Sequence, residues 1–335
     1  MNGSSQIGPD SMSPVPGHLV PIPMIVATLI LSIIGFIGNL MIVLATLVTP
    51  NLGSRCNVLI SILALCDAII CAYLIHLRIL MFIRFYNVTN WKCFWTSIYG
   101  LFALNCQSAI GLVIGIDRLL AVVLPIRYTR IPKSIYVVLI SVTLIFAFAI
   151  TYIGYEDSSD AIKVAVCLPP TAYNEKSRKI WIVCSIIIAI LVLFVYGAAQ
   201  IKCRLLSARN THEQSLQRLK KLLNSLTLVM LMYSSTWFIT VLALLATQTV
   251  SMSPSLIGII NQQLAWLVII NASTNFFIYY WRAPEYRKAF LDIVSCRCQR
   301  TRMFSISVNT QRHSHQLSMS NTAKKADREA GVILY

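Results

Sequence analysis

The stretch of sequence that decides the fold runs from residue 222 to residue 281 and reads LLNSLTLVMLMYSSTWFITVLALLATQTVSMSPSLIGIINQQLAWLVIINASTNFFIYYW. It contains no charged residue. A helix needs about 20 apolar residues to cross the hydrocarbon core of a bilayer, so this stretch is long enough for two crossings. The polar, proline-containing segment at residues 248–255 divides it. The stretch therefore predicts a protein with several transmembrane helices.

The rest of the chain is also rich in long apolar runs and poor in charged residues. Of its 335 residues 57% are apolar and 12% are charged, whereas a soluble domain carries about 25% charged residues. The apolar runs are continuous, which excludes the alternating strands of a membrane β-barrel. We predict an all-α membrane protein, a seven-transmembrane helix bundle with spans at about 22–47, 57–78, 93–118, 135–155, 179–202, 221–247 and 257–281.

The segments around the spans predict four parts of the chain. Residues 1–21 form a polar, extracellular N-terminal segment, and residues 22–281 form the transmembrane domain. No cleavable signal peptide is evident, so we expect the first span to act as an uncleaved signal anchor. Residues 283–295 are typical of a short amphipathic helix on the membrane surface. Residues 296–335 are rich in Ser, Thr, Asn and Arg and should form a disordered cytoplasmic tail.

The basic residues predict the orientation of the bundle. With the N-terminus outside the cell, three quarters of the 28 lysines and arginines lie in cytoplasmic loops or the tail, as the positive-inside rule requires. We therefore expect a multi-pass plasma-membrane protein with a cytoplasmic C-terminus. The net charge of +16 then reflects loops that face anionic lipid, and no nucleic-acid partner is implied.

Polar residues inside the spans are candidates for function because burying them is costly. Asp67 is the only acid within the spans apart from Asp117, which lies at an inner boundary. One carboxylate with several amides suits a water network or a cation such as sodium, but the same groups can also serve as hydrogen bonds between helices. The predicted network consists of Asn39, Asp67, Gln107, Asn271 and Asn275.

Several motifs follow one another over residues 35–291. They are Gly38-Asn39, Leu63-Ala64-Leu65-Cys66-Asp67, the run from Ile116 to Tyr128, Tyr196, Trp237 and Asn275-Phe276-Phe277-Ile278-Tyr279. In the order and spacing of these motifs the chain resembles the rhodopsin-like (class A) G-protein-coupled receptors. It departs from the family at Leu119, which replaces a tyrosine, and in lacking the tryptophan of the fourth span. It also carries Ile188, Ile239 and Phe276 where the family has helix-kinking prolines.

This resemblance implies an activation switch and cytoplasmic partners. The switch residues would be Asp117, Arg118, Tyr196, Trp237, Asn275 and Tyr279. The partners would be a heterotrimeric G-protein, an arrestin and a receptor kinase. A narrower resemblance, to the nematode serpentine chemoreceptor family Srsx, rests on Leu52-Gly53-Ser54-Arg55-Cys56-Asn57, Asn105-Cys106-Gln107-Ser108 and the run from Val166 to Tyr173.

The cysteines and sequons predict covalent modifications. Cys93 and Cys167 are the two of the ten cysteines expected at or beyond the outer boundary, where oxidation is favoured, and the resemblance implies the same disulfide. Cys296 and Cys298 follow the surface helix and are candidates for palmitoylation. Asn2 and Asn87 lie in glycosylation sequons on the outer side, whereas the sequon at Asn271 lies within a span.

The ligand pocket should lie in the outer half of the bundle, by analogy with the family. Candidate pocket residues, each of which could instead serve packing, are Tyr99, Leu104, Trp237, Thr240, Gln262 and Trp266. Gly100 replaces the aspartate of amine receptors, and Ile269 replaces the retinal-binding lysine of opsins. His76 and Arg78, at the outer end of the second span, could attract an anionic ligand or only reach the interface.

These observations favour a chemosensory G-protein-coupled receptor in the plasma membrane, for which a sensory cilium is one location. A neuropeptide receptor of the same fold is the alternative, and both leave the ligand open between a small molecule and a peptide. A transporter or channel is less favoured because the sequence shows no internal repeat. We expect no enzymatic activity and no cofactor, since the five histidines form no metal-binding pattern and no nucleophile–base pair is evident.

Overall fold

The computed structural model describes residues 20–209, 231, 235–247, 249–250 and 253–295. The described chain is nearly all helical. Its elements are α1 (Ile22–Val48), a 3-10 turn (Pro50–Leu52), α2 (Arg55–Phe82), β1 (Val88–Thr89), α3 (Asn90–Val123), α4 (Pro125–Arg130), α5 (Lys133–Glu156), β2 (Lys163–Val164), α6 (Pro169–Ala172), α7 (Glu175–Arg209), the helix Ser235–Thr247, α9 (Pro254–Arg282) and α10 (Pro284–Val294).

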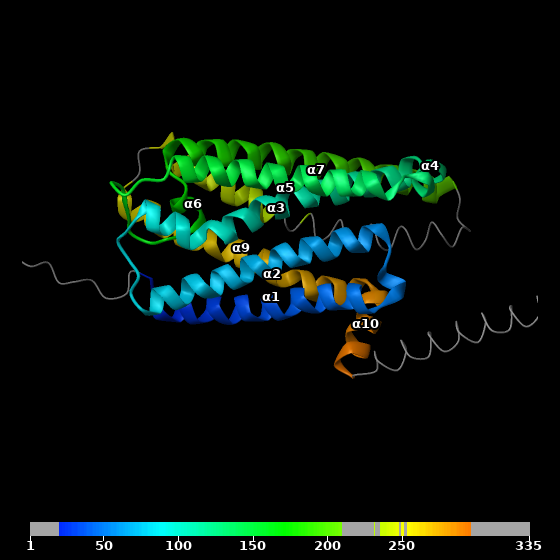
Figure 1. The fold of residues 1–335 in the computed structure, drawn as a ribbon, viewed down its shortest axis with the longest axis horizontal. Coiled ribbons are helices and arrows are strands. Elements are labelled where there is room, and N and C mark those ends of the chain that lie inside the picture. Colours follow the sequence, from blue (N-terminus) through cyan, green and yellow to red (C-terminus); the bar gives the residue numbers. More distant parts are fainter. Residues whose placement is uncertain (1–19, 210–230, 232–234, 248, 251–252, 296–335) are drawn as a thin grey trace, which may run out of the picture.

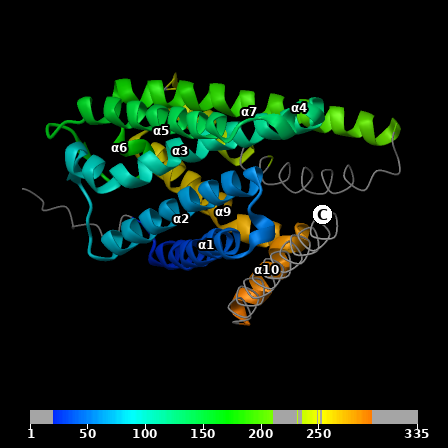
Figure 2. The same ribbon diagram turned by 45° about the vertical axis from the view of Figure 1, so that its right-hand side comes forward.

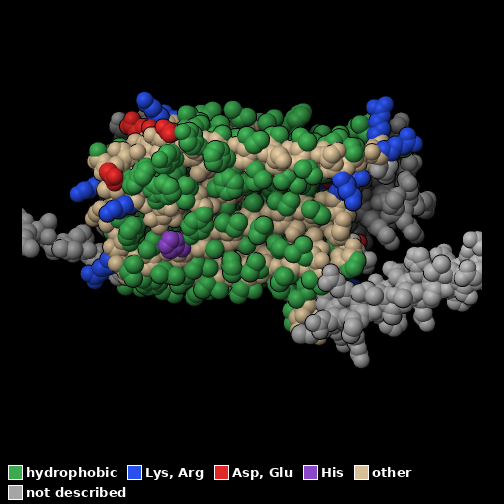
Figure 3. Space-filling view, viewed as in Figure 1, with side chains coloured by type: hydrophobic (Ala, Val, Ile, Leu, Met, Phe, Trp, Pro, Cys, Tyr) green, Lys and Arg blue, Asp and Glu red, His purple; other side chains and the backbone are tan. Residues whose placement is uncertain are grey.

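The long helices lie side by side along the long axis of the molecule, with α6 at one end and α4 at the other (Figure 1). We call these the α6 end and the α4 end. Lysine and arginine side chains gather at both ends, the acidic side chains visible on this face lie mainly at the α6 end, and an apolar band separates the two ends (Figure 3). Six described helices are long and apolar enough to cross a membrane, and Ser235–Thr247 is a shorter apolar helix. The prediction of a seven-helix membrane bundle is confirmed.

Most of the long helices start earlier or end later than their apolar runs predict. The side chain of Ser54 accepts the backbone N–H of Asn57 and so starts α2, and Thr89 does the same for Lys92 at the start of α3. Such caps satisfy the free N–H groups of a first turn outside the apolar segment. α7 carries charged residues at both ends, from Glu175 to Arg209. Hydropathy marks the membrane-buried part of each helix, whereas capping sets its full length.

The contact between α1 and α9 closes the bundle and explains one departure from the receptor family. Phe276 replaces the family's proline, and α9 runs unbroken from Pro254 to Arg282. A Cβ at Gly38 would lie 2.6 Å from the Cβ of Phe276, so only glycine leaves room for the phenylalanine. The next residue, Asn39, donates through Nδ2 to the carbonyl of Ala272, one turn before Phe276, at 2.8 Å. α1 and α9 are therefore fixed to each other by close packing and a buried hydrogen bond.

A short connection covers the α6 end of the bundle. β1 pairs with β2 in an antiparallel ribbon, and Cys93 at the start of α3 forms a disulfide with Cys167. This confirms the predicted bridge. Asn87, one of the proposed glycosylation sites, lies exposed just before β1. The other predicted modification sites, Asn2, Cys296 and Cys298, lie outside the described residues.

At the α4 end, α10 turns away from the bundle axis (Figure 2). Its Tyr286, Ala289 and Phe290 are buried, and the Tyr286 hydroxyl lies 3.2 Å from that of Thr46 on α1. Its Arg287 and Lys288 are exposed. The two faces confirm the predicted short amphipathic helix after the last span, and the buried face ties it to α1.

Candidate functional site

Asp67 joins three helices in the middle of the bundle. Its side chain is completely buried; Oδ1 accepts a hydrogen bond from Gln107 Nε2 on α3, and Oδ2 accepts one from Asn275 Nδ2 on α9 at 2.6 Å. Of the other predicted network residues, Asn39 bonds to backbone carbonyls of α1 and α9, and Asn271 lines a cavity nearby. The structure therefore brings three of the five predicted residues into direct contact.

This arrangement bears on the sodium ion suggested by the sequence. Hard cations are held by oxygen atoms, but both oxygens of Asp67 face N–H donors from Gln107 and Asn275. The residues at this carboxylate do not fit a sodium ion. Asp67 instead acts as an acceptor that links α2, α3 and α9, which is the hydrogen-bonding alternative raised by the sequence.

A second buried cluster lies at the α4 end. Arg118 donates to Asp117 Oδ2 through Nη2 and, at 2.9 Å, through Nε; the two side chains are 5% and 1% exposed. The hydroxyls of Tyr128 on α4 and Tyr136 on α5 donate to Asp117 Oδ1 at 3.1 and 2.5 Å. Arg118 Nη2 also donates to the Tyr128 hydroxyl at 3.0 Å. We call these four residues the Asp117 cluster.

Arg55 on α2 covers the Asp117 cluster. Its guanidinium lies 5.5 Å from the ring centre of Tyr136, and its Nη1 donates to the backbone carbonyl of Tyr128 at 3.3 Å. Burial raises the pKa of Tyr128, so its hydroxyl keeps the proton that it donates to Asp117. The sequence singled out Asp117 and Arg118 but not the contributions of Tyr136 and Arg55. Four helices, α2 to α5, thus hold the arginine in place.

The other predicted switch residues lie apart from the Asp117 cluster. Tyr196 on α7 and Tyr279 on α9 are buried, and neither hydroxyl has a hydrogen-bond partner in the described part of the chain. A buried hydroxyl without a partner costs about 1–3 kcal/mol, so an arrangement that gave these groups partners would be favoured by them. Asn275 is held at Asp67, and Trp237 lies further toward the α6 end.

Trp237 is the last member of an aromatic row that starts in the loop at the α6 end. The ring of Tyr173, just after α6, stacks on Trp181 of α7 with 5.2 Å between the ring centres. Trp181 in turn packs edge to face on Trp237, with 5.7 Å between the ring centres. Asn105 on α3 holds the row in place. Its Nδ2 donates to the Tyr173 hydroxyl at 3.1 Å, and its Oδ1 accepts from Trp181 Nε1 at 3.2 Å. The row connects the loop after β2 to the helix Ser235–Thr247.

Sequence reasoning did not identify this row. Asn105 belonged to a motif of the resemblance, but nothing in the sequence indicated that it would bond to Tyr173 and Trp181. Burial raises the pKa of Tyr173 to about 12, so its hydroxyl is protonated at physiological pH. It can therefore accept from Asn105 at any pH that a cell experiences.

We expect Asn105→Leu to lower the stability of the protein by about 1–3 kcal/mol, because it leaves the buried indole N–H of Trp181 without a partner and removes one partner of the Tyr173 hydroxyl. Thermal unfolding of the purified protein, followed by tryptophan fluorescence, measures the loss. Ser108→Ala is the matched control on the same helix, since it removes only a bond to the backbone of Asn105. Equal stability of the two variants would contradict this role of Asn105.

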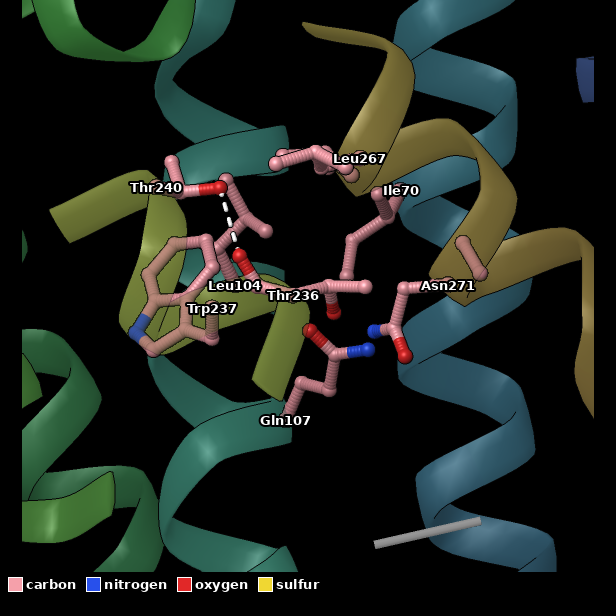
Figure 4. A pocket seen from close by; sticks show the side chains of 10 residues that line it. Ile70, Leu104, Gln107, Thr236, Trp237, Thr240, Leu267 and Asn271 are labelled. Carbon is pink, nitrogen blue, oxygen red and sulfur yellow. Dashed lines mark hydrogen bonds between the residues drawn. The ribbon is translucent and has the colours of Figure 1, made fainter. Parts of the chain in front are cut away.

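Two small cavities lie beside this row. The first, of about 10 Å³, is enclosed by α2, α3, α9 and the helix Ser235–Thr247, and the amides of Gln107 and Asn271 point toward one another at its floor (Figure 4). The second, of about 20 Å³, lies toward the α6 end beneath Leu168 and Pro169. Each cavity has room for about one water molecule.

The predicted pocket residues divide into two groups. Leu104, Trp237 and Thr240 line both cavities, whereas Tyr99, Gln262 and Trp266 line neither. The hydroxyl of Tyr99 instead lies 2.9 Å from His76 Nδ1 on the outside of the bundle. Which candidates face the cavities depends on the rotation of each helix about its own axis, and the sequence does not specify that rotation.

Gly100 has a physical role beyond the missing aspartate. A Cβ at this position would lie 2.2 Å from Cγ of Tyr73, so the Tyr73 ring occupies the space that an acidic side chain would need. Substitution by aspartate would therefore require Tyr73 to move.

Comparison with known proteins gives the family. No curated protein matches the chain. The model of the family described as serpentine type 7TM GPCR chemoreceptor Srsx matches residues 32–294, from the middle of α1 to the last residue of α10. That range includes the Asp67 contacts, the Asp117 cluster, the aromatic row and both cavities. The chain belongs to the Srsx family of seven-transmembrane chemoreceptors.

Proposed function

We propose that the protein couples binding of an extracellular small molecule to guanine-nucleotide exchange on a heterotrimeric G-protein in the cytoplasm. The N-terminus and the α6 end then lie outside the cell, and the α4 end and α10 lie inside. The distribution of lysine and arginine along the chain supports this orientation. The receptor acts in the plasma membrane, including that of a sensory cilium, and its tail (296–335) offers sites for a receptor kinase and an arrestin.

The observation that carries the proposal is the Asp117 cluster. The buried Arg118–Asp117 pair is held by two tyrosines from neighbouring elements. Such a contact can exist in two states, closed and open. Opening frees the guanidinium of Arg118 to bind a G-protein. The buried hydroxyls of Tyr196 and Tyr279 have no hydrogen-bond partner in the described part of the chain. They support a second state, in which they would form hydrogen bonds.

The cavities support a ligand site at the outer end. A ligand that entered the larger one would touch Leu104, Trp237 and Thr240, the residues that we propose as its contacts. It would also press on Trp181 and hence on the aromatic row. The small volume and the cover by Leu168 and Pro169 favour a small organic molecule over a neuropeptide, which is the alternative ligand.

The other parts of the chain have distinct places in the proposed receptor. Residues 1–21 form the extracellular segment, 22–281 the receptor domain and 283–295 the surface helix. Asn2 and Asn87 are the proposed glycosylation sites, and Cys296 and Cys298 are the proposed palmitoylation sites.

The proposal is tested by nucleotide exchange in membranes that contain the receptor and one Gα from a panel. Small organic compounds and a neuropeptide library are applied in turn. We expect at least one small compound to raise exchange in these membranes and not in membranes without the receptor. A response to neuropeptides alone would reject the chemosensory assignment. Solute flux through receptor-containing liposomes without any G-protein, together with no exchange on any Gα, would reject the coupling.

A further inference from the structure

Arg78 is a buried cation that pairs with no acidic residue among those that the structure describes. It lies on α2 near the α6 end and is 1% exposed. Its Nη1 donates to the sulfur of Met81 at 3.2 Å, but its Nε and Nη2 are buried and have no hydrogen-bond partner in the described part of the chain. Among the described residues, the pair Arg118–Asp117 is the only salt bridge.

A charge in such a place requires compensation. Removing a guanidinium from water costs several kcal/mol unless hydrogen bonds or an opposite charge replace the water. The ionisable groups that face Arg78 are the phenols of Tyr73 and Tyr86, which carry no charge at physiological pH. No carboxylate of the described residues faces it. The structure thus shows a positive charge held in place without the anion that would balance it.

The two free nitrogens form one edge of the guanidinium. Nε and Nη2 direct their N–H groups to the same side, at the spacing of the two oxygens of a carboxylate. Nη1, on the other side, is the nitrogen that Met81 occupies. The unpaired edge is therefore the one that can bind a carboxylate through two parallel hydrogen bonds.

Arg78 lies on the same helix as a residue of the cavity of about 20 Å³, which we call the outer cavity; the cavity of about 10 Å³ is the inner cavity. Ile70, Leu74 and Arg78 follow one another at four-residue intervals and so lie on one face of α2. Ile70 lines the inner cavity and Leu74 the outer one, so Arg78 lies about one turn, or about 6 Å along the helix axis, further toward the α6 end. Across the outer cavity, Asn261 on α9 has a buried Oδ1 without a partner. An apolar cavity thus has unpaired polar groups near its outer end.

We propose that Arg78 binds the carboxylate of a small organic acid whose apolar part lies in the outer cavity beside Leu74 and Leu104. This assignment rests on the proposed function, since it names the chemical class of the ligand. The cavity of about 20 Å³ must widen to admit such an acid, and this widening would displace Trp181 or Trp237, which line the same space.

The experiment compares carboxylic acids with their methyl esters. Full-length receptor in lipid nanodiscs is heated with hexanoate, octanoate or benzoate, or with the corresponding ester, at constant ionic strength, and its unfolding temperature is recorded. We expect the acids, and not the esters, to raise the unfolding temperature. In Arg78→Gln the concentration of acid needed should rise about 30-fold or more, the usual cost of removing one partner from a buried charged pair.

Arg84→Gln is the matched control, because Arg84 is an exposed arginine just beyond the same helix end. It should leave the response to acids unchanged. Arg78→Lys keeps the charge but loses the two-nitrogen edge, and should also weaken the response. If Arg78→Gln does not fold, Arg78→Lys and the acid–ester comparison on the unaltered receptor still decide the question.

Three results would overturn the assignment. The acids and esters could act equally, the acids could act equally on Arg78→Gln, or no acid could act on the unaltered receptor. Because thermal unfolding requires no G-protein, stabilisation by acids without nucleotide exchange would reject the coupling and leave the acid site intact.

Discussion

We expect Arg118→Ala to reduce guanine-nucleotide exchange on a co-expressed Gα at least about tenfold while the receptor still reaches the cell surface. In the closed state Arg118 is buried in the Asp117 cluster, and in the proposed open state its guanidinium is a donor for the G-protein. Alanine provides no donor, and hydrogen bonds from a charged group contribute about 1.5–3 kcal/mol each. One such bond corresponds to a tenfold or larger change in affinity.

The fold should tolerate this change. In Arg118→Ala, Asp117 still accepts hydrogen bonds from Tyr128 and Tyr136, so the carboxylate keeps two partners. Exchange is measured in membranes with equal amounts of surface receptor. Arg130→Ala is the control, since Arg130 is an exposed arginine at the end of α4 and removes the same charge from the same face. Full exchange in Arg118→Ala, or an equal loss in Arg130→Ala, would show that Arg118 has no specific part in coupling.

The fold could be predicted from the sequence because a bilayer imposes it. Charge-free segments of about 20 residues have few alternatives to a transmembrane helix, since every backbone N–H and C=O must be satisfied within the segment. The ends of the helices were less predictable. Ser54 and Thr89 start their helices outside the apolar runs, and α7 extends into charged sequence at both ends.

The candidate site could be predicted only in part. Asp67 and Arg118 were recognisable because a charge inside or at the edge of a span demands a partner. Which partner it finds depends on the rotation and depth of the neighbouring helices, and hydropathy is insensitive to both. Gln107 was among the candidates for Asp67, but Tyr136 was not among those for Asp117. Its hydroxyl is one of several scattered polar groups on a mainly apolar helix.

The packing of the helices shows how the bundle accommodates the absence of the family's prolines. In their absence α7 and α9 are continuous, and Phe276 fills the space beside Gly38. α9 is also held by Asn275 at Asp67. The helix Ser235–Thr247 buries Trp237 and Val241 in the apolar core. Within the proposed function, we expect this helix to move against the α1–α9 pair when a ligand enters the outer cavity, which Trp237 lines.

Removal of the Cys93–Cys167 disulfide is expected to have the largest effect on the protein as a whole. We expect Cys93→Ser and Cys167→Ser each to abolish most surface expression. The bridge joins residues 74 positions apart, and losing a native disulfide typically costs about 2–5 kcal/mol. The loop from Cys167 to Tyr173 would then be held to α3 by hydrogen bonds, such as those from Asn90 to Thr171 and Ala172, and by the packing of Tyr173 on Phe94.

The double variant separates this explanation from the loss of two independent cysteines. If the bridge is the relevant unit, Cys93→Ser/Cys167→Ser should express no worse than either single variant, because the first substitution already removes the bond. Cys184→Ser on α7 is the control for replacing a free thiol and should express normally. Additive losses in the double variant would mean that each sulfur acts through its own packing. A common loss would mean that the covalent link to α3 is what keeps Tyr173 on Asn105, and hence keeps the aromatic row aligned with Trp237.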